Sequence, residues 1–76
     1  MSDLSVTMRF DPEEGIADLE SHLDTLKRDA AAQGFTFDHH AARNELQAAT
    51  FGKRQAATAR LVLSPTGAMA IEVRTA

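Results

Sequence analysis

The sequence predicts an α+β fold in a single small domain that spans residues 1–76. One amphipathic helix packs on one face of a twisted, mainly antiparallel sheet, and the elements follow the order β-α-β-β-β. Three observations lead to this prediction. The chain opens with a strictly alternating segment, continues with apolar residues at intervals of three and four, and closes with two alternating segments joined by a turn motif.

The N-terminal third predicts a strand followed by the helix. Residues 4–10 alternate between apolar and polar side chains, as in a half-buried strand. Asp11 then fits an N-cap, Pro12 fits the first helical position, and Glu14 completes a capping box. A helix of about 20 residues that ends at Gly34 follows from one apolar stripe, formed by Ile16, Leu19, Leu23, Leu26 and Ala30.

The middle of the chain has two interpretations. Residues 35–39 alternate and predict a second strand. Residues 40–57 are rich in helix-favouring Ala, Arg, Glu and Gln, but Leu46 alternates with its polar neighbours as in a strand. The strand is the preferred interpretation, and a helix over residues 40–57 is the alternative.

The C-terminal segment predicts a hairpin with a defined register. Ser64-Pro65-Thr66-Gly67 places proline at the second position of a type I turn and glycine at the fourth, which closes a three-residue loop. If Ser64 faces Ala68, opposite-charge and apolar partners meet across the strands. The predicted pairs are Leu63 with Met69, Leu61 with Ile71 and Ala59 with Val73 on one face, and Val62 with Ala70 and Arg60 with Glu72 on the other.

Most catalytic chemistry lacks its sequence signature. The absence of cysteine excludes disulfides and thiolate metal sites, and the four glycines fit neither a dinucleotide-binding nor a phosphate-binding loop. No serine has the flanking glycines of a nucleophile elbow. His39 and His40 would point to opposite faces of a strand, so they form no metal site with His22. The sequence therefore predicts no enzyme, no cofactor and no metal.

Two charged surfaces are the candidate partner-binding sites. Residues 1–34 carry eight acids and three bases, whereas residues 35–76 carry three acids and five bases. The sheet face away from the helix would present Arg9, Arg60, Val62, Ala70, Glu72 and Arg74. The acidic helix face would present Glu13, Glu20 and Asp24. Phe51, beside a glycine and two bases, is the aromatic residue that we expect to be exposed.

These features predict a non-catalytic protein-interaction module that self-associates as a homodimer and acts as an accessory factor or inhibitor of a protein partner. The alternative is an anion or nucleic-acid binder that uses the basic sheet face, with Arg9, Arg60 and Arg74 on phosphates. No segment has the roughly 20 consecutive apolar residues of a membrane span. We therefore expect a cytoplasmic protein without a membrane partner.

Overall fold

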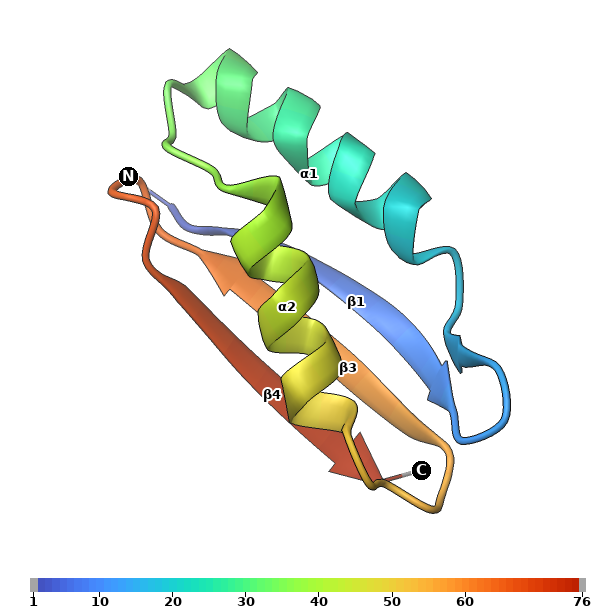
Figure 1. Ribbon diagram of the computed structural model, residues 1–76. Coiled ribbons are helices and arrows are strands. Elements are labelled where there is room, and N and C mark those ends of the chain that lie inside the picture. The colour runs from blue at the N-terminus through green and yellow to red at the C-terminus, as the bar shows by residue number, and fades with distance from the viewer. Residues whose placement is uncertain (1, 76) are drawn as a thin grey trace.

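Two helices lie side by side on one face of an antiparallel sheet (Figure 1). The computed structural model describes residues 2–75. Its elements are β1 (Leu4–Asp11), β2 (Gly15–Ile16), α1 (Leu19–Gln33), α2 (His39–Thr50), β3 (Ala57–Leu63) and β4 (Met69–Thr75). The sheet order is β2-β1-β3-β4, and each neighbouring pair is antiparallel. The predicted α+β class, with helical cover on one face of an antiparallel sheet, is confirmed.

The β3–β4 hairpin has the predicted turn and the predicted register. The Ser64 amide donates to the Ala68 carbonyl over 2.9 Å, and the Gly67 amide donates to the Ser64 carbonyl over 3.0 Å. Gly67 has a φ of 97°, the left-handed value that the fourth turn position requires. All five predicted cross-strand pairs are present, from Leu63–Met69 to Ala59–Val73 and including Arg60–Glu72.

The core lies between the sheet and the helix layer. β1 pairs with β3 from Leu4–Leu63 to Phe10–Ala57, so alternate residues of these strands face the helices. α1 packs over β1, and α2 packs over β3 and β4 (Figure 1). The largest fully buried side chains come from both layers and are Met8, Leu23, Leu46, Leu61 and Leu63.

The predicted helix start at Asp11 is wrong, although its hydrogen bonds form. The Asp11 carboxylate accepts from the amides of Glu13 over 2.7 Å and Glu14 over 3.3 Å, as an N-cap would. Gly15 then adopts a φ of 84°, and the chain turns back to pair Ile16 with Phe10 in β2. The same side-chain bonds stabilise tight turns, so they do not distinguish a turn from a helix start. α1 begins only at Leu19 and is correspondingly shorter.

The predicted strand over residues 35–39 and the preferred strand over residues 40–57 are also wrong. Residues 35–38 form a connection in which Phe35 is buried in the core. α2 follows, capped by the Asp38 carboxylate, which accepts from the Ala41 amide over 3.0 Å. Strands lie about 4.8 Å apart and a helix is about 10 Å wide, so one helix covers roughly two strands. One helix is therefore too narrow to cover the three long strands, and a second helix is needed. The alternative interpretation, a helix over residues 40–57, contained this second helix.

Candidate functional site

The sheet face opposite the helices brings the predicted sheet-face residues together. In the register, Arg9 lies in one row with Thr58 and Arg74, and Arg60 lies in the next row with Thr7 and Glu72. Val62 and Ala70 form the following row. The structure thus places all six predicted residues of this face on one surface: Arg9, Arg60, Val62, Ala70, Glu72 and Arg74. Their role in partner binding stays a prediction.

A polar depression of about 290 Å³ lies on this open face. Its lining consists of Thr7, Thr58, Arg60, Glu72 and Arg74. The Glu72 carboxylate is shared between two guanidinium groups, with Arg60 Nη1 at 3.3 Å and Arg74 Nη2 at 3.7 Å. These five side chains offer hydroxyl and guanidinium donors and one carboxylate acceptor. The depression is therefore suited to polar recognition.

The predicted acidic helix face is divided by the structure. Glu13 lies in the turn between β1 and β2, so its assignment to the helix is wrong. Glu20 and Asp24 are on α1 and face α2. The Glu20 carboxylate accepts from Arg43 Nε over 2.8 Å and lies 3.0 Å from His39 Nε2. Asp24 lies 4.0 Å from the same imidazole. This part of the acidic face therefore joins the two helices.

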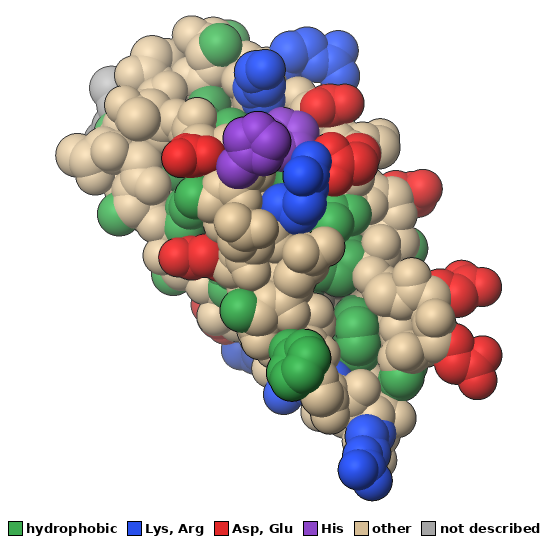
Figure 2. Space-filling model, in the orientation of Figure 1, with side chains coloured by type: hydrophobic (Ala, Val, Ile, Leu, Met, Phe, Trp, Pro, Cys, Tyr) green, Lys and Arg blue, Asp and Glu red, His purple; other side chains and the backbone are tan. Residues whose placement is uncertain are grey.

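The sequence missed this interhelical cluster because His39 was assigned to a strand and Arg43 to the ambiguous segment. Figure 2 shows blue, red and purple side chains gathered over the helix layer. Arg43 holds the Glu20 carboxylate through two nitrogens, with Nη2 also donating over 2.9 Å. This hydrogen-bonded pair, followed by the bond with His39, holds the pKa of Glu20 below its ordinary value of 4.5. The same pair raises the pKa of Arg43.

Glu20 therefore makes the stability of the protein depend on pH in the acidic range. A carboxylate with a lowered pKa stabilises the fold above pH 4.5, and this contribution is lost as the pH falls through the lowered pKa. In Arg43→Gln, we expect the NMR titration midpoint of Glu20 to move up towards 4.5 and the acid-induced loss of stability to become smaller. Arg28→Gln, at an exposed position of α1, is the matched control. An unchanged Glu20 midpoint in Arg43→Gln would contradict the assigned cause.

His39 and His40 occupy a helix start rather than a strand. His39 is half-buried in the first turn of α2, beside Phe37 at a ring-centroid distance of 6.4 Å, and His40 is exposed. Within residues 2–75, no group of three or more histidine, cysteine or acidic side chains is arranged to hold a metal ion. The same residues contain no helix with the length and apolar character needed to cross a bilayer.

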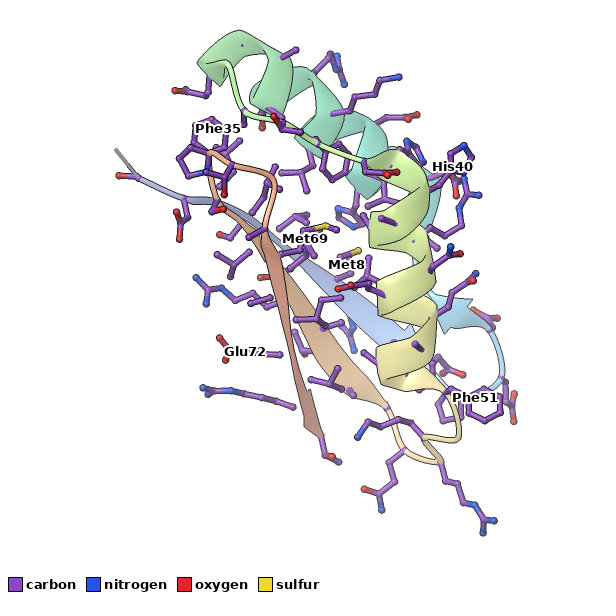
Figure 3. All side chains as sticks on the ribbon, turned by 60° about the vertical axis from the view of Figure 1, so that its left-hand side comes forward. Met8, Phe35, His40, Phe51, Met69 and Glu72 are labelled. Atoms are coloured by element: carbon purple, nitrogen blue, oxygen red, sulfur yellow. The ribbon has the colours of Figure 1, made fainter. Side chains whose placement is uncertain are left out.

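A second hollow, which we call the end groove, lies where β1 and α2 end. It has a volume of about 410 Å³, and it is lined by Phe10, Pro12, Glu14, Gly15, Ile16, Leu19, Gln47, Thr50, Phe51, Gly52 and Lys53. Phe51 is 89% exposed, which confirms the expectation for this residue. Figure 3 shows its ring beside the end of α2. Apart from Phe51, no sequence pattern predicts this groove, because its sides come from segments that are far apart in the chain.

Comparisons with known proteins give one informative similarity. No family model matches the chain, and no curated protein matches it. The chain is similar to part of a crystal structure of a proposed amino-acid aminotransferase from Mesorhizobium loti, with 30% sequence identity and a TM-score of 0.87. The match covers 96% of this chain and 35% of that chain. The protein therefore spans about a third of the length of the aminotransferase-like protein that it resembles.

This similarity contradicts the predicted function. The chain was expected to be a non-catalytic interaction module acting as an accessory factor or inhibitor, with anion or nucleic-acid binding as the alternative. The similarity is instead to a portion of a protein described as an enzyme. Ligand sites often lie between domains, so the residues of one active site can come from more than one domain, and the lack of a complete catalytic set in 76 residues does not indicate a binding protein. That the chain alone catalyses no reaction stays a prediction.

Proposed function

We propose that this chain forms one part of an amino-acid aminotransferase, the part that corresponds to the matched third of the Mesorhizobium loti protein. The observation that carries the proposal is the TM-score of 0.87 over 96% of the chain, together with 30% sequence identity. Fold similarity alone does not transfer an activity, and the sequence identity adds weight that a shared topology lacks. An aminotransferase moves an amino group from an amino acid to a 2-oxo acid.

The chain does not fit the lysine site that this chemistry needs. Amino-group transfer commonly uses pyridoxal phosphate, which a protein holds as a Schiff base on a lysine. The two lysines of the sequence are Lys27 and Lys53, and both are exposed. A Schiff-base lysine needs a desolvated site, because burial lowers its pKa and frees its amine. The lysine would therefore come from the region that corresponds to the other two thirds of the Mesorhizobium loti protein.

The open sheet face is the surface that we assign to contact with that remaining region. The helices cover the other face of the sheet, whereas Arg60, Glu72 and Arg74 lie exposed on this one. Val62 and Ala70 add a small apolar area beside them. Contacts between domains of one protein are generally more polar than permanent subunit interfaces, which fits this composition. In this arrangement, the polar depression forms part of the wall of an active site between the two regions.

A chimera tests the proposal directly. The matched third of the Mesorhizobium loti protein is replaced by this chain, and amino-group transfer from amino acids to 2-oxo acids is measured for parent and chimera with pyridoxal phosphate added. We expect the parent to be active and the folded chimera to retain activity, because the two backbones superpose closely. We expect this chain alone to be inactive. A parent without aminotransferase activity, or a folded chimera that has lost it, would contradict the proposal.

Two charge reversals in the chimera test the assigned face. Arg60→Glu places a second carboxylate beside Glu72, whose Oε1 now lies 3.3 Å from Arg60 Nη1. The variant also reverses a charge of the assigned contact surface, and a charge mismatched with its partner across an interface costs more than about 1.4 kcal/mol, so we expect at least a tenfold loss of activity. Arg28→Glu makes the same change at an exposed position of α1 and should have little effect. Equal effects of the two variants would exclude the open face as the contact surface.

A further inference from the structure

The end groove combines an apolar centre with an unusually exposed aromatic ring. Among residues 2–75, Phe51 is the large apolar side chain that the fold leaves exposed, at 89%. Ile16 and Leu19 are half-buried opposite it, and Phe10 forms part of the floor. Figure 3 shows the Phe51 ring next to the turn between β1 and β2. An exposed apolar area of this kind, bordered by polar residues, is typical of an interaction surface.

The two sides of the end groove carry opposite charges. One side, residues 10–19, holds four exposed acids: Asp11, Glu13, Glu14 and Asp18. The other side, the loop that follows α2, holds the exposed bases Lys53 and Arg54. Among the described residues, no ion pair joins these acids to these bases. Of these charged residues, Glu14 and Lys53 line the groove itself, and the others are exposed on the two segments that form its sides. The segment on one side of the groove is thus acidic, the segment on the other side is basic, and apolar side chains lie in between.

This pattern is complementary to itself, and we propose that the end groove is the interface between two copies of this chain. A twofold axis along the groove sets the acidic side of each copy against the basic side of the other. The same rotation brings Phe51 of each copy over the apolar centre of its partner. A second copy satisfies all three parts of the pattern, which is why we prefer it to an unrelated protein. The proposal does not rest on the aminotransferase assignment.

The size of the surface sets the expected strength of the dimer. A standard interface buries about 800 Å² on each partner. The accessible surface of the described chain is 5008 Å², so an interface of standard size would take about a sixth of it. The groove has 11 lining residues, fewer than the roughly 20–30 that a standard interface takes from each partner. We therefore expect a concentration-dependent dimer with a Kd on the order of 10 μM rather than a permanent one.

Sedimentation equilibrium across about 1–500 μM protein tests the proposal, since this range brackets the expected Kd. We expect Phe51→Ser to raise the dimer Kd at least tenfold. Its folding should be unaffected, because the ring is exposed, and circular dichroism checks this. Val62→Glu, on the open sheet face, is the control variant and should leave the dimer intact. Monomers of the unsubstituted chain throughout the series would overturn the proposal, as would a dimer lost in Val62→Glu but kept in Phe51→Ser.

A charge-reversal pair gives a second, independent test. One double variant, Lys53→Glu with Arg54→Glu, makes both sides of the groove acidic. The other, Glu13→Lys with Glu14→Lys, replaces the groove-lining Glu14 by a base and removes the net negative charge of residues 10–19, where Asp11 and Asp18 remain. Each variant alone should dimerise at least tenfold more weakly than the unsubstituted chain. An equimolar mixture should regain the dimer, because the acidic side of the first variant then meets the basic side of the second at one contact, and the new glutamates meet the new lysines at the other. A mixture that stays monomeric would overturn the twofold arrangement.

Discussion

Replacing Leu46 by alanine is expected to lower the free energy of unfolding by about 3 kcal/mol. Leu46 is fully buried, and it lies in the core cluster with Leu61 and Leu63. The shorter side chain loses its apolar burial and leaves a cavity that α2, held at its start by the Asp38 cap, cannot easily close. A domain of this size is stable by only about 4–11 kcal/mol, so the variant should unfold at clearly lower urea concentration. Circular dichroism during urea unfolding measures the change.

Gln47→Ala is the matched control for this substitution. Gln47 is the next residue of the same helix, and its side chain is exposed. Its replacement removes no core contact and should change the stability by less than about 0.5 kcal/mol. If Leu46→Ala lowered the free energy of unfolding by less than about 1 kcal/mol, this result would contradict the burial of Leu46 between α2 and the sheet.

Gly67→Ala is expected to destabilise the fold by about 2 kcal/mol for two separate reasons. Gly67 has a φ of 97°, which strains any residue with a Cβ atom. A Cβ at this position would also lie 3.2 Å from the Thr36 carbonyl oxygen, which is closer than ordinary contact. Thr36 cannot withdraw freely, because its amide donates to the Pro65 carbonyl in the same turn. Urea unfolding measures the loss.

Gly52→Ala separates these two causes. Gly52 has a φ of 76°, but a Cβ there would meet no atom within 4 Å. This variant should therefore show the backbone strain alone, about 1 kcal/mol. The difference between the two glycine variants measures the contact between the hairpin turn and the segment before α2. Equal losses in both would mean that this contact does not constrain the hairpin.

The hairpin could be predicted residue by residue because its determinants are local. Proline at the second turn position, glycine at the fourth and alternating apolar residues all act within about a dozen residues. They fixed the pairing from Leu63–Met69 to Ala59–Val73. The placement of six candidate residues on the open face followed from the same alternation. The surface was therefore predictable even though its function was not.

The middle of the chain was mispredicted because tertiary contacts decide it. Phe35 and Phe37 alternate as in a strand, yet residues 35–38 take part in no sheet, and Phe35 is in the core beneath the helix ends. Ala42, Leu46 and Thr50 recur every fourth residue and form the buried side of α2. This spacing, with Asp38 in a capping position, was the signal for a helix. Short-range alternation around Leu46 obscured it.

The functional prediction failed for a different reason. It took the absence of a catalytic set in the sequence as evidence for a binding protein, whereas the chain resembles about a third of a larger protein. The interhelical cluster of Glu20, His39 and Arg43 was missed because its members are on two helices, one of which was only the alternative interpretation. Both failures concern contacts between segments that are far apart in the sequence. The periodicity of apolar residues within one segment does not predict such contacts.

The pairing of β1 with β3 constrains the order in which the protein can fold. Leu4 pairs with Leu63, and both helices lie between these residues in the chain. Closing such a long loop costs more conformational entropy than closing the β3–β4 turn, and non-local pairing slows folding. During synthesis, β1 can pair at once with the short β2 that follows it, but its seven pairs with β3 must wait until residues 57–63 have left the ribosome. The pairing of β1 with β3 therefore cannot form until both helices have been made.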